Sequence, residues 1–319
     1  MVQGRLLWPP TTSIYVSKML YSLFLLIVSL LPQHHFADIP PGNYSGITWL
    51  GGDKYAVVSD KSDEDGFFIW HIGLDSITGE IKSAANEGFH SALQPNRDGE
   101  GIAFNPHTQT IFISGENDNY IKEYDLSGKL TGHEIPPTSF YKNLPENLGL
   151  EALSYNDSTR TLWTCNESGN IVIQSYGTSL QPLHHFPYTL DAPLVNQAKA
   201  QFYAHGVGTI CAFDDGSLLT LEREFYVPKK KFGAFVNCKL FHFIPDKNKK
   251  ELLTEWKTSL NLFKRDLANY EGMCLGPTLK DGSRILILVA DSQNRAHGVL
   301  KDWIKTIRIR TAHSQPSGL

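Results

Sequence analysis

The sequence is poor in cysteine: it has four, and none of them belongs to a C-x-x-C pair or to a histidine-rich stretch. Zinc sites depend on such clustered ligands, so a zinc protein is disfavoured. An even number of cysteines would permit disulfides in an exported chain. Each of the four, however, lies within an apolar, strand-like run, where a cysteine behaves as a small buried hydrophobe. We therefore expect free thiols.

The sequence also lacks a large excess of positive or negative charge. The 29 Lys and Arg residues nearly balance the 33 Asp and Glu residues, which leaves a formal net charge of -4. Nucleic-acid-binding proteins normally carry a basic stripe, so we expect no nucleic-acid partner. The chain contains no G-x-S-x-G, H-E-x-x-H or phosphate-binding glycine motif. A Ser-His-Asp triad assembled in space would leave no such signature and stays open.

The apolar run from Leu20 to Leu31 is too short to cross a bilayer as a helix, and it suits the hydrophobic region of a signal peptide. Because Met19 stands directly before it, we interpret residues 1–31 as an upstream extension followed by a signal-type segment. On this interpretation the protein is exported from the cytoplasm, and its mature chain has no membrane span. The alternative is an apolar N-terminal helix that stays attached.

The rest of the composition is that of a folded protein with a large core. Hydrophobic residues make up 41% of the chain and aromatic residues 11%. The 26 Gly and 17 Pro residues indicate many turns. This balance favours short strands over long helices, and therefore an all-β fold.

One short pattern occurs five times along the chain. It consists of a polar or acidic residue, a small residue, an aliphatic residue, a small residue and a large apolar residue. Its copies are Ser45–Trp49, Glu100–Phe104, Glu151–Tyr155, a degenerate copy at Thr209–Phe213, and Glu271–Leu275. A turn and further β-rich runs follow each copy. Four antiparallel strands per repeat, stacked radially, form the blade of a β-propeller, where small residues suit the crowded inner strand.

The sequence therefore predicts a β-propeller of five four-stranded blades over residues 32–310, followed by a disordered tail at 311–319. A six-bladed ring would need a repeat that we do not find. The last repeat shows three clear strands, so its fourth must come from elsewhere. Pro32-Gln33-His34-His35-Phe36 resembles Pro182-Leu183-His184-His185-Phe186, which holds the fourth-strand position of the third repeat. We therefore expect an N-terminal strand to close the ring.

Carboxylates recur at two positions of the repeat: at the start of first strands, and just after the end of second strands. Antiparallel pairing brings these positions to one face, so the two sets converge on one mouth of the channel. The first set is Glu100, Glu151 and Glu271, and the second is Asp60, Glu116, Glu167, Glu222 and Asp291. Crowded carboxylates attract hard cations, of which calcium is the leading candidate. Alternatively, these side chains cap backbone amides as structural pins, or pair with Lys61, Arg223 and Arg295.

At these same residues the sequence resembles a known family. Tyr44–Trp49 with Ala56–Asp60, Asp98–Ala103, Leu219–Glu224 and Asn269–Cys274 look like the phytase-like β-propeller family, often labelled "esterase-like activity of phytase". The resemblance covers roughly residues 38–310. The resemblance implies a periplasmic or secreted bacterial protein, and it implies that the repeated Glu and Asp residues are candidates for phosphoester chemistry. The sequence departs from β-propeller phytases in having five blades where they have six, and in having Ser45 and Thr209 at two of the Glu positions.

Two functions follow as hypotheses. The first is a calcium-dependent hydrolase of phosphoesters or related esters, with Glu100, Glu151, Glu271 and Arg223 as catalytic residues and a small anionic or ester substrate. The carboxylates of the mouth other than Glu167 would be the metal ligands. The second is a non-catalytic propeller that binds a sugar, peptide or partner protein at its rim. In either case we expect a monomer.

Overall fold

The structure is a computed structural model that describes residues 25–145, 148–229 and 232–312. Its regular elements in these residues are β-strands, apart from three short 3-10 helices, η1 (Gln197–Lys199), η2 (Pro245–Lys247) and η3 (Ala296–Gly298). Among the described residues, no helix is long and apolar enough to span a membrane.

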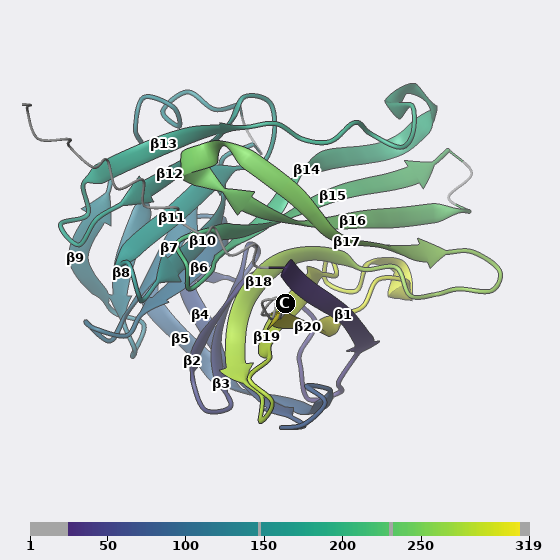
Figure 1. Cartoon of the computed structure of the whole chain (residues 1–319), viewed down its shortest axis with the longest axis horizontal. Helices are drawn as coiled ribbons and strands as arrows, with labels where there is room; N and C mark the ends of the chain where they lie inside the picture. Colours follow the sequence, from purple (N-terminus) through teal and green to yellow (C-terminus); the bar gives the residue numbers. More distant parts are fainter. Residues whose placement is uncertain (1–24, 146–147, 230–231, 313–319) are drawn as a thin grey trace, which may run out of the picture.

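The strands form five four-stranded antiparallel sheets, and each sheet is one of the predicted blades (Figure 1). From the inner to the outer strand, blade 1 contains β2 (Tyr44–Gly51), β3 (Lys54–Ser59), β4 (Glu64–Leu74) and β5 (Ile81–Pro95). Blade 2 contains β6 (Gly99–Asn105), β7 (Thr110–Gly115), β8 (Ile121–Asp125) and β9 (Leu130–Ile135). Blade 3 contains β10 (Leu150–Asn156), β11 (Thr161–Asn166), β12 (Ile171–Tyr176) and β13 (Pro182–Tyr188).

Blade 4 contains β14 (Ala200–Ala212), β15 (Leu218–Pro228), β16 (Ala234–Ile244) and β17 (Lys249–Leu260). Its inner strand, β14, is longer than the inner strand of any other blade. Blade 5 contains β18 (Asn269–Thr278), β19 (Arg284–Asp291), β20 (Ile304–Ala312) and, as its outer strand, β1 (Leu25–His34). The inner strands contact one another in the cyclic order β2, β6, β10, β14, β18 and back to β2. The ring is therefore closed, and the prediction of a five-bladed propeller is confirmed.

The hydrophobic core is divided into five clusters, and each cluster lies between two neighbouring blades. Between blades 1 and 2, for example, Val58 and Phe67 pack with Ile102 and Ile113. This division is what radial stacking requires, because each blade has two faces to bury. A blade that lost one face would expose an apolar surface, so the stability of every blade depends on its neighbours.

Glycine on the inner strands allows the blades to approach closely at the channel. A Cβ atom on Gly46 would lie 2.6 Å from the backbone oxygen of Glu100 in the next blade. A Cβ atom on Gly101 would lie 2.4 Å from the backbone nitrogen of Leu153. No side chain fits at these distances, so the small residue of the repeated pattern is a packing requirement of the ring.

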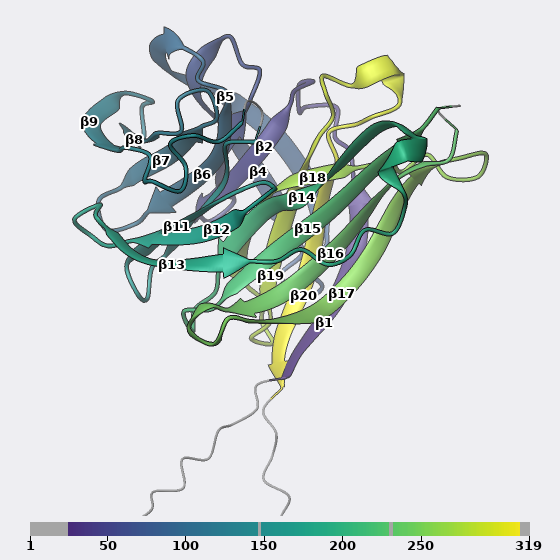
Figure 2. The ribbon, with the colours of Figure 1, turned by 90° about the horizontal axis from the view of Figure 1, so that it is seen from above.

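The N-terminal strand closes the ring as predicted, but it begins earlier in the sequence. β1 pairs antiparallel with β20, and the two strands lie side by side in both views (Figures 1 and 2). The strand takes in Leu25–Leu31, most of the run that we interpreted as a signal-type segment. Leu26 and Val28 pack on the core between blades 4 and 5, whereas Ile27 is 47% exposed, as the alternation of a strand dictates.

The first part of that run, residues 20–24, lies outside the described residues, as does the predicted extension before it. The predicted tail begins at residue 311, but β20 continues to Ala312, and residues 313–319 lie outside the described residues. All four cysteines are free and buried, which confirms the expectation of unpaired thiols.

Candidate active site at the acidic mouth

Each inner strand carries a β-bulge at the same place, where one extra residue stands opposite the second strand. Such bulges re-aim a side chain and are common beside active sites. The position of the extra residue corresponds to Ser45, Glu100, Glu151, Gly208 and Glu271. The glutamates of the repeated pattern are therefore presented at one mouth of the channel by a backbone feature that all five blades share.

In blade 4 the position of the bulge differs by one residue from the position expected when the five copies of the repeated pattern are aligned. The bulge lies between Val207 and Thr209, so Gly208 and not Thr209 occupies the glutamate position. On β15 the residue equivalent to Asp60, Glu116, Glu167 and Asp291 is Arg223, and not Glu222. The two changes are linked, because a Cβ atom on Gly208 would lie 3.1 Å from the Cδ and Nε atoms of Arg223. Glycine thus leaves room for a cation in blade 4, which has no glutamate at this position.

Glu222 is therefore not part of the acidic mouth, contrary to the prediction from sequence. Adjacent residues on a strand point to opposite faces, so the one-residue shift turns Glu222 away from the channel. Its side chain is 2% exposed and lies 2.6 Å from Lys250 Nζ, and the hydroxyl of Tyr188 donates to it at 2.8 Å. Glu222 and Lys250 thus form a structural ion pair within blade 4, and the hydrogen bond from Tyr188 ties this pair to blade 3.

Arg223 joins three of the predicted glutamates at the centre of the mouth. Its Nη2 atom lies 2.8 Å from Glu271, 3.1 Å from Glu167 and 3.4 Å from Glu151. The guanidinium is buried, with its side chain 7% exposed. One cation from blade 4 therefore binds carboxylates of blades 3 and 5, as the ion-pair alternative anticipated.

A second group of carboxylates lies on the blade 1 and blade 2 side. Asp60, Asp98 and Glu100 place one oxygen each within 4.8 Å of one another, an arrangement that could hold a metal ion. Lys61 Nζ lies 2.6 Å from Asp98 and 3.4 Å from Asp60. The sequence analysis missed Asp98, although its position two residues before Glu100 was a signal. Arg295 does not contribute, since it pairs with Asp302 at 2.5 Å.

The mouth as a whole holds more negative charge than its two cations balance. Its carboxylates are Asp60, Asp98, Glu100, Glu116, Glu151, Glu167, Glu271 and Asp291. The cations that contact them are Arg223 and Lys61. Ionised carboxylates at such short range repel one another strongly unless further cations are bound.

This repulsion and burial together shift the pKa values of the group upward. Burial, with Asp291 as the main charged neighbour, raises the pKa of Asp60 to about 7. Burial and nearby carboxylates raise the pKa of Glu271 to about 8, against the opposing effect of Arg223. The pKa of Glu100 is raised well above its ordinary value, first by burial and then by Glu151. Without added cations, part of the mouth is thus held protonated near neutral pH.

Several buried oxygens of the mouth have no donor among the described residues. Glu100 is 8% exposed, yet no described group donates a hydrogen bond to its carboxylate. Asp60 Oδ1 and Asn269 Oδ1 are buried without a partner. Asn269 is 3% exposed, and its amide nitrogen donates to Glu271 at 2.8 Å. Buried acceptors without donors are costly, and they mark a place where a cation or a substrate group would complete the site.

The sequence as a whole was then compared with known proteins. The model of the phytase-like family, described as esterase-like activity of phytase, matches residues 39–293. The chain belongs to this family. The matched region of the phytase-like chain begins after β1 and ends just beyond β19, so it holds every residue of the acidic mouth. None of the curated proteins searched matches the sequence.

Solved structures resemble the phytase-like chain only distantly. A streptogramin B lyase is 14% identical, covers 89% of this chain and 98% of its own, and has a TM-score of 0.39. A luciferin-regenerating enzyme is 10% identical, with coverages of 88% and 95% and a TM-score of 0.46. A member of the duf4221 family from Bacteroides vulgatus is 10% identical, with coverages of 90% and 99% and a TM-score of 0.43. Likeness of this degree carries no argument about activity, and the architecture rests on the strand pairing itself.

Proposed function

We propose that this chain hydrolyses phosphoesters or related esters at the acidic mouth with the help of a bound divalent cation, and that the cation is calcium. The observation that carries the proposal is the set of eight carboxylates, which contact two cations among the residues that the structure describes. Oxygen-only ligands of this kind suit a hard cation. Membership of the phytase-like family supports an ester or phosphoester substrate.

The residues present fit such an ion. Asp60, Asp98 and Glu100 bring their oxygens close together, and Glu100 has no competing donor among the described residues. When bound, a divalent cation would stabilise negative charge on the ester oxygens and lower the pKa of a water molecule. Lys61 borders both this cluster and a cleft of about 650 Å³ that Asn43 and Ser59 also line. Of the described residues that form the cluster and its ion pairs, Lys61 is the one that lines this cleft, so its ammonium group is placed to attract a small anionic substrate.

The remaining glutamates are placed to hold or move protons. Arg223 and Asn269 both bind Oε1 of Glu271, and no described group binds its Oε2 atom. Arg223 likewise contacts Oε1 of Glu151. The two Oε2 atoms are therefore the ones that could accept a proton from the attacking water and return it to the leaving oxygen. Arg223 holds both carboxylates in place and offsets part of their charge.

Chromogenic esters test this function. Chelator-treated protein is assayed with 4-nitrophenyl phosphate, bis(4-nitrophenyl) phosphate and 4-nitrophenyl acetate, with and without added calcium. We expect calcium-dependent turnover of at least one ester, and a loss of about a hundredfold in Glu271→Gln, as for the removal of a proton-transfer group. Glu222→Gln is the matched control, since that buried glutamate lies outside the mouth. Turnover that does not respond to calcium, or that Glu271→Gln leaves unchanged, would contradict the proposal.

The alternative function, a non-catalytic rim that binds a sugar, peptide or partner protein, gives a different result in the same experiment. Calcium would then raise the melting temperature without any turnover. Binding to the native state alone stabilises a protein by about 2.7 kcal/mol at a hundredfold excess over Kd. Stabilisation that Glu100→Gln removes, together with inactivity on all esters, would favour this alternative.

We also propose that the protein works as a monomer in the bacterial periplasm or outside the cell, as the apolar N-terminal run suggested. Because β1 begins at Leu25, cleavage after residue 31 would remove most of that strand. We therefore expect the exported protein to keep Leu25. Cell fractionation with N-terminal sequencing checks this, and a protein found only in the cytoplasm would contradict it.

A further inference from the structure

The opposite end of the channel contains a separate pocket with different chemistry. It has a volume of about 480 Å³, within the roughly 300–1,000 Å³ range of small-molecule sites. It lies at the C-terminal ends of the inner strands, whereas the carboxylates stand at their N-terminal ends. Ile47, Ile102, Leu153 and Met273 form its floor and are 2–3% exposed. This apolar layer separates the pocket from the acidic mouth.

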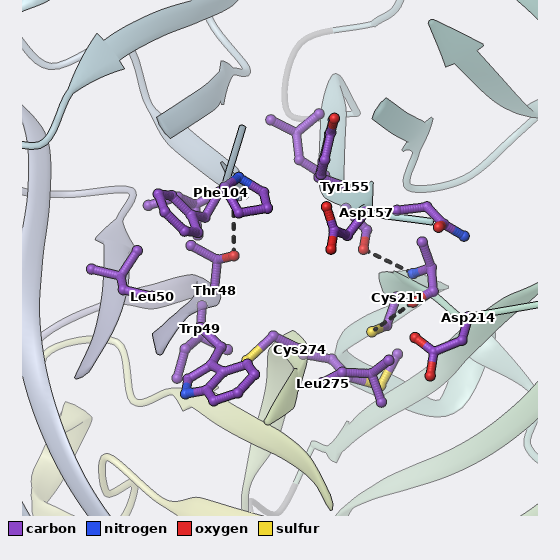
Figure 3. A pocket seen from close by; sticks show the side chains of 18 of the residues that line it. Thr48, Trp49, Leu50, Phe104, Tyr155, Asp157, Cys211, Asp214, Cys274 and Leu275 are labelled. Carbon is purple, nitrogen blue, oxygen red and sulfur yellow. Dashed lines mark hydrogen bonds between the residues drawn. The ribbon is translucent and has the colours of Figure 1, made fainter. Parts of the chain in front are cut away.

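Aromatic side chains from three blades line the walls. Trp49, Phe104 and Tyr155 are the large apolar residues that end the repeated pattern in blades 1, 2 and 3. All three pack with one side against the core between the blades and are partly exposed. Figure 3 shows them around one open space, with Cys274 of blade 5 beside Trp49. Flat aromatic faces of this kind bind ring-shaped ligands by stacking.

A threonine hydroxyl in the pocket wall has a hydrogen to donate. The backbone N–H of Phe104 donates to Thr48 Oγ1 at 3.1 Å, and that of Ala212 donates to Ser154 Oγ at 2.8 Å (Figure 3). The Ser154 hydroxyl also hydrogen-bonds the Cys211 thiol, whereas no described residue accepts a hydrogen bond from Thr48. Thr48 is 9% exposed, so its donor is buried at the pocket wall. A ligand with an acceptor oxygen would satisfy this hydroxyl.

Carboxylates at the rim supply acceptors that are already oriented. Asp157 lies 2.7 Å from Nε2 of His107, and Asp214 forms an ion pair with Arg284. Both aspartates line the pocket and are more than half exposed. Their carboxylate oxygens can accept hydrogen bonds from a neutral ligand.

We infer that this pocket binds a neutral sugar ring, either a free saccharide or the end of a glycan. A sugar hydroxyl both donates and accepts, which matches the free donor of Thr48 and the acceptors of Asp157 and Asp214. The C–H faces of the ring match the aromatic walls. A quaternary ammonium ligand would use the aromatic walls but would leave the Thr48 donor unpaired.

The test uses the whole chain on an array of neutral oligosaccharides built from glucose, galactose, mannose and N-acetylglucosamine, followed by titration calorimetry with a retained sugar. We expect binding that chelator does not change, because the acidic mouth is not involved. Loss of one stacking side chain in Trp49→Ala should weaken binding by about tenfold. Asp157→Asn should also weaken it while preserving the fold, since that side chain is 67% exposed.

Two control variants keep the outcomes distinct. Phe263→Ala removes a 95% exposed aromatic ring that does not line the pocket, and should bind as the wild type does. Glu100→Gln alters the acidic mouth and should leave sugar binding unchanged. Failure to retain any neutral sugar, or binding unaffected by both Trp49→Ala and Asp157→Asn, would overturn the inference. Preference for choline over every sugar, or loss of sugar binding in Glu100→Gln, would also overturn it.

Discussion

Replacing Arg223 with methionine tests whether the acidic mouth depends on a cation for its stability. The buried guanidinium lies within 3.4 Å of three glutamates on two other blades. Removing one partner of a buried ion pair costs about 3–5 kcal/mol, because the remaining charges lose their counter-charge. At about 2 °C per kcal/mol for a chain of this size, the melting temperature should fall by about 6–10 °C.

The assay is thermal melting in chelator at pH 7.5, repeated with calcium and at pH 5. Both changes should recover part of the loss in Arg223→Met. Calcium would supply the missing positive charge, and acid would neutralise glutamates whose pKa burial has already raised.

Lys250→Met is the matched control. It leaves Glu222 buried without its lysine, but on the side of the sheet away from the mouth. We expect it to lose stability that calcium does not restore. If Arg223→Met melts like the wild type, or if calcium restores both variants equally, the argument that the mouth needs a cation is wrong.

Two further predictions concern the N-terminal strand and pH. A truncation that begins at His35 removes β1, and the lost packing of Leu26 and Val28 alone should lower the free energy of unfolding by about 3 kcal/mol. A truncation that begins at Leu25 keeps the strand and should be as stable as the full chain. Denaturant unfolding measures both. Equal stability of the two truncations would refute closure by β1. In chelator, the free energy of unfolding should fall as pH rises from about 5 to 8, because the folded protein binds more protons than the unfolded chain does. The carboxyls responsible, with pKa values raised to about 6, 7 and 8, are Asp291, Asp60 and Glu271. Calcium should flatten this dependence, and a rise in stability over that range in chelator would contradict it.

Much of the architecture could be predicted because each copy of the repeat is a short, continuous stretch of sequence. The five copies of the pattern mark the five inner strands, and the turns and apolar runs after them mark the other strands of each blade. The match between Pro32–Phe36 and Pro182–Phe186 identified the closing strand, because both segments belong to outer strands or follow one directly. The convergence of Glu100, Glu151 and Glu271 also followed from antiparallel pairing alone.

Tertiary structure decided what depends on register and on contacts between blades. Residue similarity aligned Thr209 and Glu222 with the acidic positions, but the β-bulge at Gly208 places Arg223 there instead. A shift of one residue reverses the face of a side chain, and a single sequence does not reveal the position of a bulge. The pairing of Asp98 with Lys61, and the meeting of Trp49, Phe104 and Tyr155 around one pocket, join residues of different blades. The sequence by itself determined how many blades there are and where the acids recur, whereas only the closed ring decided which of them meet.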